Sequence, residues 1–163
     1  ESLGGSDFDL IEMGGGAASS TVISPKIFEK FCLPYDQKLH QALHDVGHKL
    51  VYHTCGGMMK ILDLIVANGC DASETLSPPG VGGDADPEEI KRRIGNKVCL
   101  IGGMDQINLL TNGTPEEIRS VTKRLFEALG PGGGFILSAS DHFFHAPVEN
   151  LRAFAEAADE CVY

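Results

Sequence analysis

Strand-like and helix-like segments alternate along the whole chain, and this alternation limits the fold more than any other feature. Short runs of β-favouring residues, many ending in Gly, separate longer stretches in which apolar residues recur at helical spacing. Strands that alternate with helices pair in parallel, so the pattern predicts an α/β fold. The expected strands cover residues 8–13, 49–54, 70–76, 98–103 and 135–138. The expected helices begin near residues 25, 36, 58, 87, 115 and 147.

Several helix starts carry recognisable capping residues. Ser24 precedes Pro25, which suits an N-cap followed by the first helical position. Asp86 is followed three residues later by Glu89, and Thr114 is followed in the same way by a Glu. This spacing predicts two capping boxes, in which the N-cap and the third helical residue bond each other's backbone N–H groups.

Ionisable residues stand at the carboxyl ends of the predicted strands. The carboxyl ends of parallel strands meet at one rim, where (β/α)8 barrels build their active sites. Five βα units are too few for a closed barrel of about 250 residues. The sequence therefore predicts a partial (β/α)8 TIM barrel with functional groups at its rim, namely Glu12, His53, Cys55, Glu74, Asp105, Asp141 and His142.

His53 and Cys55 form a His-Thr-Cys motif at the end of one predicted strand. Alternate residues of a strand point the same way, so the imidazole and the thiol are expected on one side, about 6–7 Å apart along the chain. This donor pair suits a soft divalent metal, above all zinc. The alternative is a buried thiol beside a histidine that bonds a backbone carbonyl.

Three further histidines, His40, His44 and His48, recur every four residues along a predicted helix. We expect them to form a solvated helix face behind the barrel wall, away from the rim. Asp105 has two interpretations of equal weight: a group that contacts substrate or supports the site, or a loop residue that caps the next helix.

Composition narrows the classes of partner. The net charge of −10 opposes nucleic-acid binding, and no apolar run approaches the roughly 20 residues of a membrane helix. Five scattered cysteines indicate reduced thiols and a cytoplasmic location.

The 163 residues are enough for a single domain, 1–163. Because Glu1 opens the chain and a strand follows almost at once, we expect a fragment or a processed product.

The motifs resemble those of the uroporphyrinogen decarboxylase (URO-D) superfamily. The resemblance covers essentially the whole chain and implies strands four to eight of a (β/α)8 barrel. It also implies that the remaining part of the barrel, or a second copy of the chain, closes the open sheet. The segments that carry it are residues 52–56, 74–79, 101–105, 134–138 and 146–151.

Within this superfamily the chain is more similar to the zinc-dependent branch of corrinoid:thiol methyltransferases. That branch carries a His-x-Cys on one strand, matched by His53 and Cys55, and a Cys on the last strand. Residues 138–142, Ser-Ala-Ser-Asp-His, stand at the place of that Cys. The resemblance therefore implies Asp141 or His142 as a third zinc ligand and Glu74 as a fourth.

The resemblance implies methyl transfer between a corrinoid (cobalamin) on a partner protein and a thiol or corrinoid acceptor, with Glu12 and Asp105 as catalytic groups. The alternative within the superfamily is decarboxylation of a tetrapyrrole. That reaction requires a cationic lining for a polycarboxylate, and the predicted rim is mostly acidic. An alternative of another class is an inactive fragment, or one chain of a split barrel.

Overall fold

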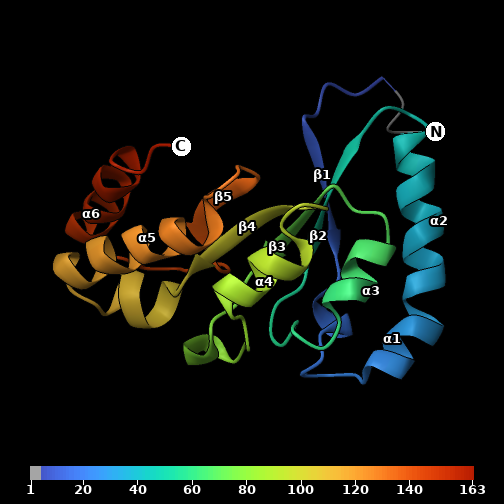
Figure 1. Cartoon of the computed structure of the whole chain (residues 1–163), viewed down its shortest axis with the longest axis horizontal. Coiled ribbons are helices and arrows are strands. Elements are labelled where there is room, and N and C mark those ends of the chain that lie inside the picture. Colours follow the sequence, from blue (N-terminus) through green and yellow to red (C-terminus); the bar gives the residue numbers. More distant parts are fainter. Residues whose placement is uncertain (1–4) are drawn as a thin grey trace.

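The computed structural model describes residues 5–163 and confirms the α/β fold. In this part of the chain, five strands pair in parallel in their sequence order (Figure 1). Each strand is followed by one or more helical segments, as the alternation predicts. The strands are β1 (Leu10–Gly14), β2 (Lys49–His53), β3 (Ala72–Thr75), β4 (Cys99–Met104) and β5 (Phe135–Ala139).

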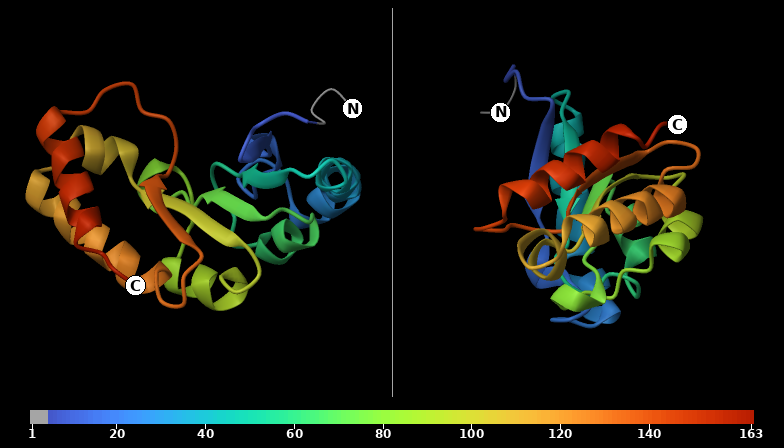
Figure 2. Two further views of the ribbon diagram at one scale, coloured as in Figure 1. Left: turned by 90° about the horizontal axis from the view of Figure 1, so that it is seen from above. Right: turned by 90° about the vertical axis from the view of Figure 1, so that its left-hand side faces the viewer.

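The sheet is curved, and the helices lie along its convex side. Seen from above, α3, α4 and α5 line one side, while the described residues place no α-helix over the concave side (Figure 2, left). This is the arrangement of a partial (β/α)8 barrel wall. The α-helices are α1 (Pro25–Phe31), α2 (Leu33–His44), α3 (Leu62–Ala67), α4 (Pro87–Ile94), α5 (Pro115–Leu129) and α6 (Val148–Asp159).

The strand register decides which residues face the concave side. Directly paired residues of neighbouring strands point to the same face of the sheet. The pairs Gly14–His53, His53–Glu74, Glu74–Ile101 and Ile101–Ile136 therefore place these five residues in one row. His53 and Glu74 are the ionisable members of the row, and both lie at the carboxyl-end half of the sheet.

The opposite face of the sheet forms the hydrophobic core with the helices. Leu50, Tyr52, Leu100 and Met104 alternate with the concave row and are almost completely buried. Each large apolar side chain removed from water contributes about 1.5–3 kcal/mol, so this layer fixes the register. The helices supply the other half of the core, including Leu62, Ile65, Ile90, Ile94, Ile118 and Leu129.

Two of the three predicted helix caps form in full. The Ser24 side chain accepts a hydrogen bond from the Ile27 N–H, and Thr114 makes the complete capping box with Glu117. Asp86 accepts from the Glu89 N–H at 3.0 Å, but no reciprocal bond closes a box. The Glu89 carboxylate instead binds the Arg92 guanidinium one turn later, a charge-assisted pair that outcompetes a neutral backbone donor.

Some element boundaries differ from the expectation. α2 begins at Leu33 rather than near residue 36, because Pro34 fits the first turn of a helix. α3 begins at Leu62 rather than near residue 58, since the preceding residues form a turn. Between β4 and α5 a six-residue π-helix, Gln106–Thr111, appears where the sequence pattern predicts no element.

The expected solvated histidine face is wrong. His40 and His48 are buried, and half-buried His44 bonds the Asp71 carboxylate at 2.8 Å. The His40 ring packs edge-on against Tyr52 with centroids 5.8 Å apart, and its Nδ1 lies 2.8 Å from the Asn68 carbonyl oxygen. α2 thus buries a polar aromatic ring, because Tyr52 of β2 offers a ring to pack against and Asn68 at the end of α3 offers a carbonyl partner.

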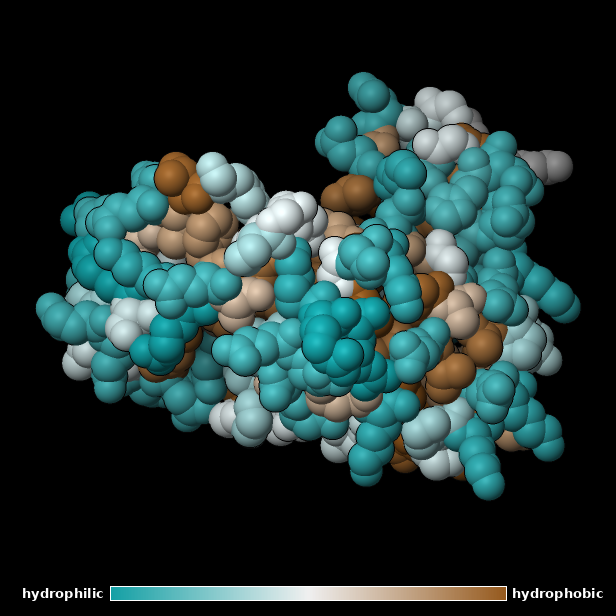
Figure 3. All heavy atoms as spheres, in the orientation of Figure 1, coloured by the Kyte–Doolittle hydropathy of each residue, from teal (hydrophilic) through white to brown (hydrophobic). Residues whose placement is uncertain are grey.

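The outer surface agrees with the composition. Much of the face in Figure 3 is hydrophilic, and hydrophobic residues are exposed on it mainly around α3. Among the described residues, no helix combines the length and the apolar character needed to cross a bilayer.

Candidate metal centre

Four strands bring ionisable groups to one end of the sheet. His53 is the last residue of β2, and Glu74 lies beside it on β3. Glu12 comes from β1, and Asp141 follows β5. Cys55 lies two residues beyond His53, where the chain turns away from the sheet. Residues that are far apart in sequence therefore meet because the sheet curves around them.

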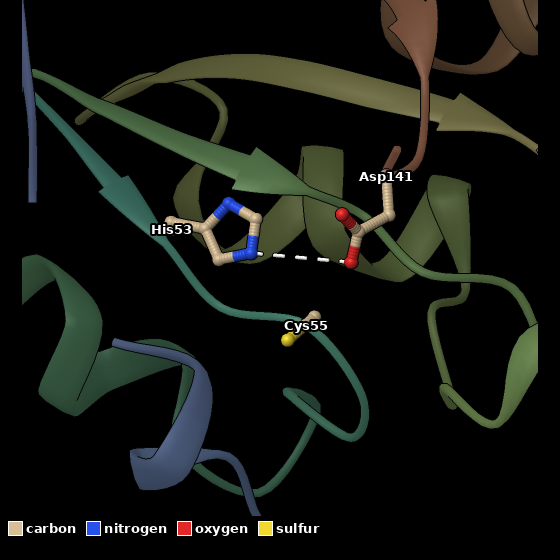
Figure 4. A group of neighbouring side chains, drawn as sticks. All are labelled: His53, Cys55 and Asp141. Carbon is tan, nitrogen blue, oxygen red and sulfur yellow. Dashed lines mark ion pairs between the residues drawn. The ribbon is translucent and has the colours of Figure 1, made fainter. Parts of the chain in front are cut away.

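His53 is the centre of this group. Its Nδ1 lies 2.8 Å from Glu74 Oε1 and 3.6 Å from Glu12 Oε1. Its Nε2 faces the other way and lies 3.9 Å from Asp141 Oδ2 (Figure 4). The imidazole side chain is only 14% exposed. A carboxylate on Nδ1 fixes the orientation of the ring and leaves Nε2 available for another partner.

Cys55 and Asp141 converge on the Nε2 side of His53. One ligand atom each from His53, Cys55 and Asp141 lies within 4.8 Å of the other two. Figure 4 shows the thiol and the carboxylate directed toward the same space beside the ring. A second group, Glu12, His53 and Glu74, meets the same distance limit but offers no sulfur, and its histidine nitrogen already bonds Glu74.

The His53, Cys55 and Asp141 donors fit zinc. Tetrahedral zinc with bonds of about 2.0–2.3 Å holds its ligands about 3.5 Å apart, so small side-chain movements would bring the three into range. A nitrogen, a sulfur and a carboxylate oxygen are all zinc ligands, and three protein ligands with one open position are typical of catalytic zinc. A soft cation prefers sulfur as a ligand. It therefore favours this group over Glu12, His53 and Glu74, which offer only oxygen and nitrogen.

The protonation of the group depends on its surroundings. Burial and the nearby Asp141 charge raise the pKa of the Cys55 thiol above its ordinary value. Burial opposes ionisation of Asp141, but hydrogen bonds from the backbone and ring of His142, with attraction from His53, hold its pKa below the usual range. Hydrogen bonding to Asp141 raises the pKa of His142. A bound cation would lower the pKa of the Cys55 thiol and so favour its thiolate form.

A polar cavity of about 380 Å³ opens beside the imidazole. Ten residues of this chain line it, and none of them is Lys or Arg. Gly16 keeps space free nearby, because a Cβ at this position would lie 2.9 Å from the Cys55 sulfur. The lining residues are Glu12, His53, Glu74, Thr75, Ser138, Ala139, Ser140, Asp141, His142 and Phe143.

Four predicted site residues lie outside the three-ligand group. Glu12 and Glu74 lie on the Nδ1 side of His53, so metal ligation by Glu74 and a catalytic role for Glu12 stay predictions. The other two are His142 and Asp105. The His142 side chain is 84% exposed, and its Nδ1 bonds Asp141 Oδ1 at 2.7 Å. Asp105 Oδ1 accepts from the N–H groups of Ile107 and Asn108, at 3.0 and 2.7 Å. Asp105 thus caps the π-helix, which agrees with the capping interpretation. Catalytic contact by Asp105 and metal ligation by His142 stay predictions.

Sequence reasoning missed the side chains that hold the loop after Cys55. Ser77, Thr21 and Asp84 accept hydrogen bonds from backbone N–H groups of residues 56–59. These acceptors are 21 or more positions from their donors in the sequence, so no local sequence pattern predicts these hydrogen bonds.

Comparison with known proteins places the fold among characterised enzymes. The sequence model of the uroporphyrinogen decarboxylase (URO-D) family matches residues 7–161. A methylated-thiol–coenzyme M methyltransferase of Methanosarcina mazei is 30% identical, over 93% of this chain and 38% of the relative. The methylcobamide:CoM methyltransferase MtbA of the same organism is 26% identical, over 95% and 43%. The uroporphyrinogen decarboxylase of Pseudoalteromonas translucida is 32% identical, over 85% and 38%.

The solved structure of a methyltransferase from Methanosarcina mazei has a similar fold. It superposes with a TM-score of 0.80 at 24% identity and covers 94% of this chain and 42% of its own. The chain therefore spans about two fifths of the length of the proteins it matches.

Proposed function

Because the chain belongs to the uroporphyrinogen decarboxylase family, we propose that it is part of a zinc-dependent methyltransferase acting between a corrinoid and a thiol. The observation that carries the proposal is the convergence of His53, Cys55 and Asp141 within 4.8 Å beside an open cavity. Two relatives named as methyltransferases of a methylated thiol and of methylcobamide support it.

In this proposal His53, Cys55 and Asp141 would hold zinc, and a thiol substrate would enter through the cavity beside them. Zinc supplies positive charge that keeps a bound thiol in its nucleophilic thiolate form. Glu74 accepts the Nδ1 proton of His53 and so directs Nε2 toward the ligand group. Glu12, whose carboxylate reaches the same cavity, takes up the proton that the thiol releases.

The methyl donor would be a corrinoid presented by a separate protein. The relative named as a methylcobamide:CoM methyltransferase suggests coenzyme M as a first acceptor to assay. The loop after β5 contributes Asp141, His142 and Phe143 to the cavity lining, and it also carries the fully exposed Phe144. A partner that delivers the methyl group would meet this loop at the cavity.

Tetrapyrrole decarboxylation is the second candidate, favoured by the 32% identity to a uroporphyrinogen decarboxylase. A polycarboxylate substrate needs cations around it. Glu12, Glu74 and Asp141 surround the cavity with negative charge, and none of its lining residues in this chain is a Lys or Arg. The lining therefore supports a cation site better than a carboxylate site.

Metal content and methyl transfer test the proposal together. Purified protein should contain zinc near one equivalent, and the double variant His53→Ala, Cys55→Ala should contain almost none. With methylcobalamin and coenzyme M, zinc-loaded protein should accelerate loss of the methylcobalamin spectrum, whereas the variant should not. Absence of zinc after reconstitution, together with binding of a tetrapyrrole, would favour the decarboxylase.

We propose further that residues 1–163 are one C-terminal portion of a single barrel. Within the described residues β1 and β5 each pair with one neighbour only, so both are sheet edges. Unpaired edges invite pairing with another chain. Size-exclusion chromatography should show self-association of this chain, which adding the remaining barrel strands should abolish. A stable, active monomer would contradict this proposal, and a monomer without activity would favour the inactive fragment.

A further inference from the structure

The loop that follows Cys55 is held by side chains from other parts of the molecule. The Gly57 N–H donates to Thr21 Oγ1 at 2.7 Å, and the Gly56 N–H to Ser77 Oγ at 3.4 Å. The Met58 and Met59 N–H groups both donate to Asp84 Oδ1, at 2.6 and 3.1 Å. Four successive backbone donors are thus satisfied by residues remote in sequence, although the loop belongs to no regular element.

Asp84 is the charged member of this set. It accepts two N–H groups through a carboxylate oxygen, and hydrogen bonds to an ionised acceptor are roughly twice as strong as neutral ones. Gly57 leaves room for its neighbours, because a Cβ there would lie 2.6 Å from Ser20 Oγ and 3.3 Å from Asp84 Oδ2. The adjacent Met58 side chain is completely buried and anchors the same turn in the core.

Cys55 lies between this anchored turn and an equally restrained strand end. On its other side, the Thr54 N–H donates to the Glu74 carbonyl at 2.9 Å, and Thr75 Oγ1 donates to the Thr54 carbonyl at 3.1 Å. The backbone of Cys55 is therefore held from both directions. The Cα of Cys55 can move little unless one of the two restraints is released, so the sulfur changes its position mainly by rotation about χ1.

We propose that Asp84 is a positioning residue for the metal centre, one that sets where the Cys55 sulfur lies without contacting the ion. The inference rests on the proposed function, since it gives Cys55 a ligand role. When the loop is already ordered, metal binding does not cost the conformational entropy of ordering it. Loss of residues that support metal ligands typically costs 10–100-fold in affinity, and we expect about tenfold here.

The chain offers a matched control two residues away. Asp86 also accepts a backbone N–H at the start of a helix, from Glu89 at 3.0 Å, but it does not bond the loop after Cys55. Asp84→Ala and Asp86→Ala each remove, from the same segment, one carboxylate that accepts backbone N–H groups. Asp84→Asn keeps an oxygen acceptor without the charge and serves where the Ala variant fails to fold.

Two readouts separate this inference from the proposed function. In metal-free protein, the rate at which iodoacetamide labels Cys55, measured by peptide mass spectrometry, should rise several-fold in Asp84→Ala and stay unchanged in Asp86→Ala. In cobalt-loaded protein, cobalt affinity should fall about tenfold and the thiolate-to-cobalt absorption band should weaken in Asp84→Ala, with Asp84→Asn intermediate.

Equal labelling of Cys55 in wild-type and Asp84 variants, or equal loss of cobalt affinity in the Asp84 and Asp86 variants, would overturn the inference. If wild-type protein binds neither zinc nor cobalt, the proposed function fails. The labelling experiment would still decide whether Asp84 positions Cys55.

Discussion

Each end of the sheet contains a histidine beside at least one carboxylate, and the charges of the two groups are balanced differently. We call His44, Lys49 and Asp71 the base cluster, because they lie at the amino ends of β2 and β3. Asp71 bonds Lys49 Nζ and His44 Nε2, each at 2.8 Å, and accepts the Leu50 N–H at 2.9 Å. Its negative charge has a permanent positive partner, so the base cluster is complete within this chain.

The rim cluster, Glu12, His53, Glu74 and Asp141, has no such balance. Three carboxylates lie around the His53 imidazole, the exposed His142 pairs with one of them, and no Lys or Arg of this chain lines their cavity. Gathered like charges cost free energy in the folded state. The comparison suggests that the base cluster stabilises the sheet, while the rim cluster and Cys55 are arranged to receive a cation.

The largest expected difference between the ends is in metal affinity. His53→Ala should lower zinc affinity more than about 100-fold, because it removes a ligand and not only a supporting group. His44→Ala should leave zinc affinity unchanged and lower the free energy of unfolding by about 1 kcal/mol. Competition titration with a zinc-binding dye measures the zinc affinity of each variant, and urea unfolding measures its free energy of unfolding. Equal affinities in the two variants would remove the distinction between the clusters.

Zinc itself should stabilise the fold through the rim. A zinc concentration of about 100 times the Kd should raise the free energy of unfolding by about 2.7 kcal/mol. Urea unfolding of wild-type protein with and without zinc measures this change. Cys55→Ser should abolish most of it, whereas Lys49→Ala should retain it. Stabilisation that survives in Cys55→Ser would place the ion elsewhere.

Acid should act mainly through the base cluster. Burial works to raise the pKa of Asp71, but hydrogen bonds from Lys49, His44 and Leu50 lower it to about 2. A depressed carboxyl pKa stabilises the folded state above the unfolded value near 4, and this stability is lost as the pH falls from about 4 to 2.

Asp71→Asn should therefore cost about 1–2 kcal/mol at neutral pH, a figure reduced for partial solvent screening, and flatten the acid loss in that pH window. Unfolding in urea across the pH range, beside the exposed control Asp159→Asn, checks it. An unchanged acid profile would show that the base cluster does not supply this stability.

The smallest effect is expected at the most exposed rim carboxylate. The Glu12 side chain is 59% exposed, and Glu12→Gln removes one of the three like charges. The free energy of unfolding of metal-free protein should rise by about 0.5 kcal/mol, while zinc affinity falls a few-fold. Thermal unfolding and dye competition measure the two. A lower free energy of unfolding in the variant would indicate that the negative charge of Glu12 stabilises the rim and does not repel its neighbours.

Sequence patterns that depend on neighbouring residues predicted the structure well. The alternation of strands and helices and the Ser24 and Thr114 caps all form. The spacing of His53 and Cys55 correctly indicated that their side chains converge. Predictions failed where a side chain took a partner that the pattern did not include. His40 bonds the Asn68 carbonyl 28 positions away, and the Glu89 carboxylate binds Arg92 and not the backbone of its N-cap.

The sequence by itself determined the order of the elements, the rim as the place of the ionisable residues, and the His53–Cys55 pair. These follow from backbone periodicities that act within a few residues. Only the tertiary structure showed that an Asp141 oxygen lies within 4.8 Å of the pair, that Glu74 bonds the other imidazole nitrogen, and that Asp84 accepts hydrogen bonds from the loop. Those contacts join residues on different strands and loops, so they depend on how the packed core curves the sheet.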